Sequence, residues 1–173
     1  MEVRSSKSSV YRVRVAEDGD LPAIADIYND VVLNSTATFD VEPWTPEGQQ
    51  RWLSEHRHPY AVLVAEQADE VVGWAALKAF ASKPAYRFTA ENTVYVRSDM
   101  QGGGIGALLL ARLLEAAAEN GFRTVIARIA APNPASVRLH RRFGFRRVGV
   151  EREVGHKFDR WLDVVVMQKA LAE

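Results

Sequence analysis

A glycine-rich turn between a strand and a helix constrains this chain more than any other stretch. Residues 94–98 read Val-Tyr-Val-Arg-Ser, and residues 101–106 read Gln-Gly-Gly-Gly-Ile-Gly before an apolar helical pattern. Glycine lets successive backbone N–H groups point into one concavity, and the start of the helix adds partial positive charge. The turn is therefore predicted to bind an anion, most naturally a phosphate or diphosphate. A helix start without a ligand is the alternative, but its glycines would lower helix stability.

The hydrophobic pattern predicts one mixed α/β unit with the order β-α-α-β-β-β-α-β-α-β-β. Asp20 and Pro22 have the residue types that open a helix, and Gly121 suits the left-handed position after one. Strands are predicted at residues 11–15, 60–66, 71–80, 91–98, 123–130, 145–155 and 161–170, and helices at about 20–31, 45–56, 103–120 and 133–144. Residues 1–9 read as a flexible leader, and residues 10–173 as a single domain without repeats.

Composition excludes several classes of function. Lys plus Arg and Asp plus Glu both number 22, so the formal charge is zero, whereas nucleic-acid binders usually carry a basic excess. The chain has no cysteine, which excludes disulfides, thiolate metal ligands and a catalytic thiol. No metal-ligand spacing and no membrane-length apolar run is visible. We therefore expect a cytoplasmic protein with no metal, no nucleic-acid partner and no membrane partner.

Other phosphate-binding turns fit this glycine stretch poorly. A nucleotide-hydrolase loop would end in Gly-Lys-Ser or Gly-Lys-Thr, but here the helix continues Gly-Ala-Leu. A dinucleotide-binding turn would read Gly-x-Gly-x-x-Gly and follow the first strand, but this turn follows the fourth. The spacing is instead Gln101-x-x-Gly104-x-Gly106.

That spacing resembles the acetyl-CoA diphosphate loop of the GNAT N-acetyltransferase superfamily. The stretch Asn133-x-x-Ser136-x-x-x-His140-x-x-x-Gly144-Phe145 is similar to the second signature of the same superfamily. Residues 89–96 and 155–163 are similar to its phosphinothricin and methionine sulfoximine acetyltransferase branch. The resemblance spans roughly residues 11–170 and implies the GNAT fold, a mostly antiparallel mixed sheet flanked by helices. It also implies acetyl-CoA as cosubstrate, a small amine as acceptor, and a homodimer.

The resemblance assigns the residues that meet the coenzyme. The fourth strand is expected to splay from the fifth and expose its backbone to the pantetheine arm, although a plain core strand is the alternative for this segment. Asn133 is expected to bind the pantetheine amide, to cap its helix, or to do both. The cofactor-binding residues so implied are Val94, Tyr95, Val96, Gln101, Gly102, Gly103, Gly104, Ile105, Gly106, Ala107 and Asn133.

Two residues are the catalytic candidates. Glu91 begins the fourth strand, and the resemblance places it beside the acceptor amine. An ordinary glutamate pKa near 4.3 lies far below that of an alkyl ammonium, so a water relay or a pKa raised by burial is needed. His140 stands where the wider superfamily generally has a tyrosine that protonates the thiolate. A solvated carboxylate and a structural histidine are the respective alternatives.

The acceptor pocket is assigned by the same resemblance to Phe39, Tyr86, Arg87 and Lys157. Methionine sulfoximine enzymes typically carry Asp-Trp-Arg upstream of that aromatic-Arg pair, where this chain has Ala79-Phe80-Ala81. One presumed carboxylate-binding arginine is therefore missing, and Lys83 is a candidate replacement, though as a point charge without the guanidinium fork.

The remaining charged residues receive less specific expectations. His56 and His58 lie in a polar stretch and are expected to be solvated. The basic cluster between residues 138 and 147 is expected to be a solvated face, and one of its members is a candidate contact for the 3′-phosphate of the coenzyme. Two other functions stay open, namely a sensor that binds acetyl-CoA without turnover and an acetyltransferase for protein or peptide amines.

Overall fold

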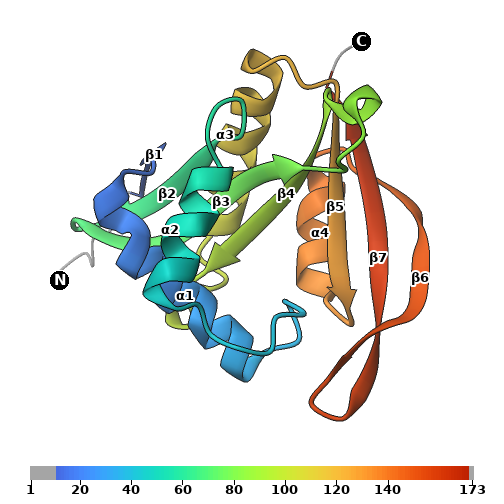
Figure 1. Ribbon diagram of the computed structural model, residues 1–173, viewed down its shortest axis with the longest axis horizontal. Helices are drawn as coiled ribbons and strands as arrows, with labels where there is room; N and C mark the ends of the chain where they lie inside the picture. Colours follow the sequence, from blue (N-terminus) through green and yellow to red (C-terminus); the bar gives the residue numbers. More distant parts are fainter. Residues whose placement is uncertain (1–10, 172–173) are drawn as a thin grey trace, which may run out of the picture.

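The computed structural model describes residues 11–171, so the predicted leader at residues 1–9 lies outside the described part. Seven strands form one sheet in the order β1-β2-β3-β4-β5-β7-β6 (Figure 1). Their bounds are Arg12–Val15 (β1), Val62–Gln67 (β2), Glu70–Ala79 (β3), Thr89–Val96 (β4), Thr124–Ala131 (β5), Arg146–Lys157 (β6) and Arg160–Ala170 (β7). Only the pairing of β4 with β5 is parallel, so the predicted mixed, mostly antiparallel sheet is confirmed.

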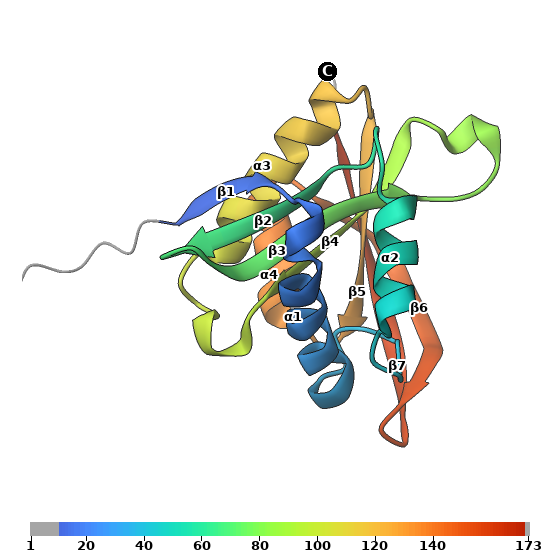
Figure 2. The ribbon, with the colours of Figure 1, turned by 60° about the vertical axis from the view of Figure 1, so that its left-hand side comes forward.

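Within residues 11–171, four α-helices cover the two faces of this sheet, and their order along the chain is the predicted one. Helices α1 (Leu21–Asn34) and α2 (Pro46–Glu55) lie on one face, and α3 (Ile105–Glu119) and α4 (Pro134–Arg142) lie on the other (Figure 2). Within residues 11–171, the structure has no helix with the length and apolar character needed to span a bilayer.

Each face of the sheet has its own core. The stripe predicted on the long helix is confirmed, because Ile105, Leu109, Leu113 and Ala117 are all buried in the core beneath α3. The opposite core combines aliphatic side chains of α1, β2 and β3 with two aromatic ones, Tyr28 of α1 and Trp74 of β3. Strand β4 contributes to both cores, since side chains alternate along a strand. Ala90, Val94 and Val96 pack on the α3 side, and Tyr95 packs on the α1 side.

The sheet opens between its two parallel strands. β4 pairs with β3 along nearly its whole length, from Ala90 opposite Ala79 to Val96 opposite Gly73. Its pairing with β5 ends at Glu91 opposite Ile126, after which the two strands diverge (Figure 1). The Arg97 N–H donates to Val72 of β3, so by alternation the backbone groups of Val94 and Val96 face the opening. The predicted splay of the fourth strand is therefore confirmed.

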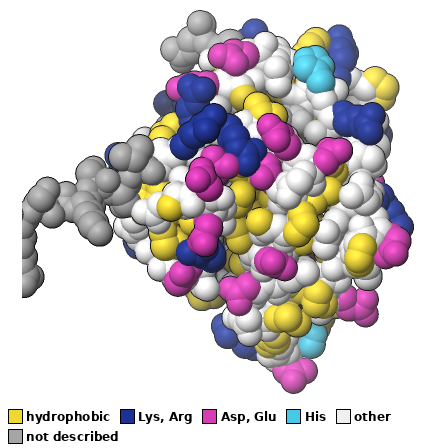
Figure 3. Space-filling view, turned by 90° about the vertical axis from the view of Figure 1, so that its left-hand side faces the viewer, with side chains coloured by type: hydrophobic (Ala, Val, Ile, Leu, Met, Phe, Trp, Pro, Cys, Tyr) yellow, Lys and Arg dark blue, Asp and Glu magenta, His cyan; other side chains and the backbone are white. Residues whose placement is uncertain are grey.

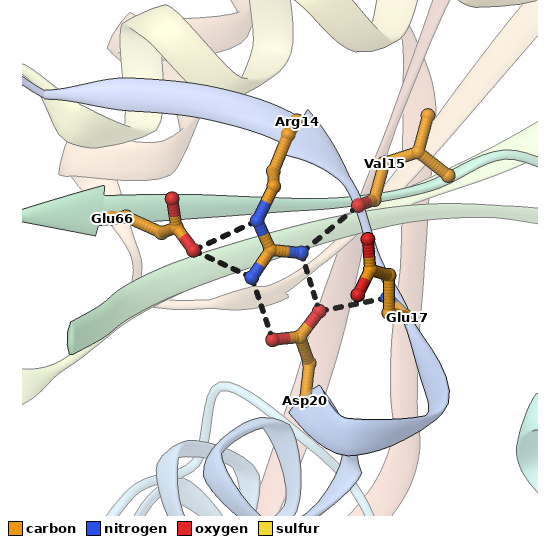
Figure 4. A network of polar contacts seen from close by, with 5 residues as sticks. All are labelled: Arg14, Val15, Glu17, Asp20 and Glu66. Carbon is orange, nitrogen blue, oxygen red and sulfur yellow. Dashed lines mark hydrogen bonds and ion pairs between the residues drawn. The ribbon is translucent and has the colours of Figure 1, made fainter. Parts of the chain in front are cut away.

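The start of α1 differs from the sequence prediction. Asp20 precedes the helix as expected, but its carboxylate does not bond the helical N–H groups. It accepts two hydrogen bonds from the Arg14 guanidinium and one from the Glu17 N–H, while Arg14 also donates to Glu66 of β2 (Figure 4). Arg14 holds the pKa of Asp20 below its usual value. Asp20 therefore connects the start of α1 to Arg14 on β1, the edge strand of the sheet.

Charges are mixed on one face of the molecule, and a basic cluster is exposed on α4 and β6. On the side seen in Figure 3, acidic and basic side chains are interspersed with apolar ones. The basic cluster on α4 and early β6 is exposed, as predicted, and consists of Arg138, Arg141, Arg142, Arg146 and Arg147.

Candidate active site

A cavity of about 1220 Å³ occupies the opening between β4 and β5. Its lining comes from both faces of the sheet: the glycine turn, α3 and α4 on one side, and α1, the loop after it and α2 on the other. Typical pockets for drug-sized ligands measure roughly 300–1,000 Å³. The opening is therefore large enough for an extended ligand that reaches through the sheet to meet a second, smaller one.

The glycine turn forms a cradle at one end of this cavity. Gly102 and Gly104 have φ angles of +81° and +84°, a conformation that favours glycine, and a Cβ at either position would meet nothing within 4 Å. Among the described residues, the N–H groups of Gly102, Gly103 and Gly104 have no hydrogen-bond acceptor. The first N–H groups of α3, at Ile105 and Gly106, likewise have no partner within the helix. Together they offer an anion several converging donors.

Other predicted coenzyme residues surround this cradle. Gln101 lines the cavity, and its side-chain amide donates to Val96 O over 3.3 Å. Val94, Tyr95, Val96, Ile105 and Gly106 also line the cavity. Gly103 and Ala107 do not line the cavity. Gly103 packs against Tyr11 instead, where an added Cβ would lie 3.0 Å from the Tyr11 hydroxyl oxygen.

Helix α4 supplies the next part of the lining. Asn133 Oδ1 accepts the Ser136 N–H over 3.0 Å, so Asn133 caps the helix as predicted. Seven residues later His140 lies on the same side of the helix, because seven residues make nearly two turns. Both residues line the cavity, and His140 is only 4% exposed.

The hydrogen bonds of His140 fix its tautomer. Nδ1 lies 2.8 Å from the Ser136 carbonyl oxygen, which can only accept, so Nδ1 carries the proton. Nε2 then accepts from Asn92 Nδ2 at 2.9 Å. Burial lowers the pKa of His140, which keeps the ring neutral near pH 7. The other amide atom, Asn92 Oδ1, is buried without a partner among the described residues.

Glu91 lies on the other face of β4. Asn92 points to the α3 and α4 side, so alternation sends its neighbour Glu91 to the side of α1 and α2. Across the β3–β4 pair, Lys78 is its register partner, and the Lys78 Nζ lies 3.1 Å from Glu91 Oε1. The two predicted catalytic residues thus line one cavity from opposite faces of the sheet.

The loop after α1 forms a wall on the Glu91 side. The Tyr28 hydroxyl bonds Thr38 Oγ1 and Asp40 Oδ2, both at 2.7 Å, and the buried Lys157 ammonium donates to Thr38 O over 3.0 Å. Burial lowers the pKa of Lys157. Lys157 is therefore a tether for this loop and does not line the cavity.

Phe39 does line the cavity, as the resemblance implied. Its ring rests directly on the backbone of Gly155 in β6, where a Cβ would lie 2.3 Å from a ring carbon. Gly155 thus sets the position of the aromatic side chain.

Aromatic side chains cover the rest of this face. Trp52 of α2 packs in a tilted arrangement against Trp44 and edge-to-face against Trp74, with ring centroids 5.1 and 5.3 Å away. Burial raises the pKa of Tyr95 to about 12. The expectation of a solvated His56 is wrong. Its ring stacks on Trp52 at 4.2 Å, its Nδ1 bonds the Trp52 carbonyl, and burial lowers its pKa. His58 is exposed, as expected.

Three residues of the 80–88 loop are not brought to this cavity. Lys83, Tyr86 and Arg87 are exposed and absent from its lining, because the loop extends away from the sheet (Figure 2). In the sequence, Lys78 and Asn92 were missed. Pairing residues 71–80 with residues 91–98 in an antiparallel register would have placed Lys78 beside Glu91, but nothing in the sequence indicates the partner of Asn92.

Within residues 11–171, no group of three or more His, Asp or Glu side chains is arranged to hold a metal ion. The donors that converge in the cavity are instead backbone N–H groups, amides and an imidazole, which suit a polar organic ligand.

Comparison with known proteins identifies the family. The family described as "Acetyltransferase (GNAT) domain" matches residues 13–166. Phosphinothricin N-acetyltransferase of Streptomyces coelicolor is 44% identical over 92% of this chain and 96% of its own. An L-methionine sulfoximine/L-methionine sulfone acetyltransferase of Pseudomonas paraeruginosa is 42% identical over 90% and 92%. The crystal structure of a GNAT superfamily phosphinothricin acetyltransferase from Sinorhizobium meliloti in complex with AcCoA superposes with a TM-score of 0.90, at 36% identity over 94% of this chain and 89% of that one. The chain therefore belongs to the GNAT acetyltransferase family.

Proposed function

We propose that this protein transfers the acetyl group of acetyl-CoA to the primary amine of a small amino-acid-like acceptor, of the phosphinothricin or methionine sulfoximine type. The observation that carries the proposal is the opening between β4 and β5. It joins a cradle of free N–H groups on one face of the sheet to the carboxylate of Glu91 on the other. A coenzyme and an amine can therefore meet in the middle of the sheet.

The coenzyme half of the cavity supports this assignment. The N–H groups from Gly102 to Gly106 would hold the diphosphate. The backbone N–H and C=O of Val94 and the N–H of Val96, which face the opening, would bond the amides of the pantetheine arm. Asn133 is already engaged as a helix cap, so its remaining amide protons are what it can offer the arm.

The chemistry requires one bond to form and one to break. The amine nitrogen bonds the acetyl carbon, the carbon–sulfur bond breaks, one proton leaves the amine, and one reaches the sulfur. We assign the first proton to Glu91, acting through a water molecule because a carboxylate is a much weaker base than the amine. His140 lies on the coenzyme side and is the second catalytic residue of the proposal. Its Nε2 exchanges a proton only after Asn92 releases it.

The same proposal includes a single acetyltransferase domain at residues 10–173, a homodimer and a cytoplasmic location. Large exposed apolar side chains on the β6–β7 hairpin, among them Val154, Phe158 and Trp161, support a partner surface there. Light scattering coupled to size-exclusion chromatography tests the homodimer. The expected molar mass in solution is twice the chain mass of 19.3 kDa.

An acceptor panel tests the function. The protein is mixed with acetyl-CoA and, separately, phosphinothricin, L-methionine sulfoximine, L-methionine sulfone, spermidine and a peptide with a free N-terminal amine. Free thiol and the mass of each acceptor are measured. We expect thiol release together with an acetylated amino acid analogue. Coenzyme binding without thiol release would favour a sensor, and acetylation of the peptide alone would favour a protein acetyltransferase.

A further inference from the structure

Two opposite charges meet across the β3–β4 pair inside the cavity. Lys78 and Glu91 are register partners, their charged atoms lie 3.1 Å apart, and both side chains line the cavity. The Glu91 side chain is 15% exposed and the Lys78 side chain 51% exposed. The carboxylate is thus held in place, while the ammonium has room to move.

Lys78 is the cation best placed for an anionic group on the acceptor. Among the described residues of the lining, only Lys78 and Arg128 carry a permanent positive charge. Arg128 lies across the opening on β5 and is paired with Glu151 of β6. The lining also holds four carboxylates, namely Asp30, Asp40, Glu55 and Glu91. Without Lys78 this end of the cavity would repel an acceptor that carries a carboxylate.

The ion pair matches the charges of an amino acid. An amino acid carries an ammonium and a carboxylate on one carbon, so it presents the reverse of the Glu91–Lys78 pair at a similar spacing. A half-exposed salt bridge is screened by solvent and contributes little to stability, so opening it to admit the acceptor costs little. Both protein charges then regain a partner.

We propose that Lys78 is a specificity-determining residue that binds the carboxylate of the acceptor while Glu91 receives its amine. The inference rests on the proposed function and deepens it. Lys78 supplies from β3 the charge that the missing arginine at Ala81 does not. The amine is thereby placed at the carboxylate that takes its proton.

A paired-acceptor experiment tests this role. The kcat/KM of wild type and Lys78→Gln is measured with L-methionine sulfone and with its carboxamide, which lacks only the negative charge. A hydrogen bond between charged groups is worth about 1.5–3 kcal/mol, so we expect a roughly 10–100-fold loss for the carboxylate acceptor. The carboxamide should lose less than about threefold. Effects of the amide on the acceptor amine are common to both enzymes and cancel in the ratio.

Two further variants complete the experiment. Lys78→Arg should restore the preference for the carboxylate acceptor, since it keeps the charge. Lys83→Gln removes the other candidate cation, whose side chain is exposed and does not line the cavity. This variant should leave the preference for the carboxylate acceptor unchanged. Equal losses of kcat/KM for both acceptors in Lys78→Gln would overturn the inference about Lys78. Loss of the preference for the carboxylate acceptor in Lys83→Gln instead would do the same. Neither result would affect the proposed function. If wild type acetylates neither acceptor nor any other amino acid, the proposed function fails and the inference fails with it.

Discussion

The side-chain amide of Asn92 donates a hydrogen bond to Nε2 of His140 over 2.9 Å. Because Nδ1 of the same ring is bonded to the Ser136 carbonyl, both ring nitrogens are engaged within the protein. His140 is therefore held as one neutral tautomer, ready for a proton only when the amide turns. A turned amide would present Oδ1, which accepts the N–H of the protonated ring.

The pKa of His140 should respond to this contact. Burial lowers it in the wild type, so NMR titration of the ring should place it below the ordinary value of about 6.5. Asn92→Asp puts a negative charge against Nε2 and should raise the pKa of His140. His140→Gln identifies the signal among the four histidines. A His140 pKa above about 6.5 in the wild type, or an unchanged His140 pKa in Asn92→Asp, would contradict the contact between Asn92 and His140.

Glu91→Gln should reduce kcat by about 10²–10⁴-fold, the usual contribution of a general base. The affinity for CoA, measured by calorimetry, should stay unchanged because Glu91 lies on the acceptor side of the sheet. Glu115→Gln, an exposed position on α3 outside the cavity, is the matched control and should retain full activity. Loss of CoA binding in Glu91→Gln would contradict this placement, because it would mean that the Glu91 carboxylate contacts the coenzyme.

The cradle has a matched control at the other end of the same helix. Gly104 and Gly121 have φ angles of +84° and +82°, and neither has an atom within 4 Å of an added Cβ. Valine at either position costs similar backbone strain, about 1–2 kcal/mol. Only Gly104→Val fills the cradle, so it should weaken CoA binding by more than tenfold while Gly121→Val does not. Similar affinities in the two variants would show that the turn holds no diphosphate.

Gly155 should control the acceptor through Phe39. Alanine there would drive its Cβ to 2.3 Å from the ring and displace it, so Gly155→Ala should raise the KM for the acceptor and leave CoA affinity intact. Gly149→Ala, on the same strand with open space around it, should behave as wild type. Equal acceptor KM values in the two variants would remove Phe39 from the pocket wall.

The Arg14–Asp20 contact should stabilise the fold in a pH-dependent way. Asp20 has a folded pKa below its unfolded value of 3.8. Its contribution is therefore complete above about pH 4 and is lost as pH falls through the lower folded value. Asp20→Asn should cost about 1–3 kcal/mol in urea unfolding at pH 7, and less at pH 3. Asp18→Asn, exposed in the same turn, should cost far less; equal losses would contradict the assignment.

Local patterns predicted the elements and the glycine cradle, because both depend on residues close in sequence, while the family resemblance assigned the other coenzyme residues. The glycines of the turn, the cap at Asn133 and the spacing to His140 all lie within single strand–helix segments. The acceptor half was predicted less well, since it depends on contacts between distant segments. The Lys78–Glu91 pair needs the register of two strands, and the partial burial of His56 needs Trp52 to pack against Trp74. Asp20 was expected to cap its own helix, and its actual partner was missed because Arg14 lies on a different element, β1.

A crystal structure with bound acetyl-CoA tests the central claim most directly. The account predicts the diphosphate oxygens within about 3.2 Å of the N–H groups between Gly102 and Gly106, with the thioester in the opening between β4 and β5. From there the acetyl carbon would face Glu91 through the sheet. A coenzyme bound elsewhere, or one whose thioester stops short of that opening, would contradict the account.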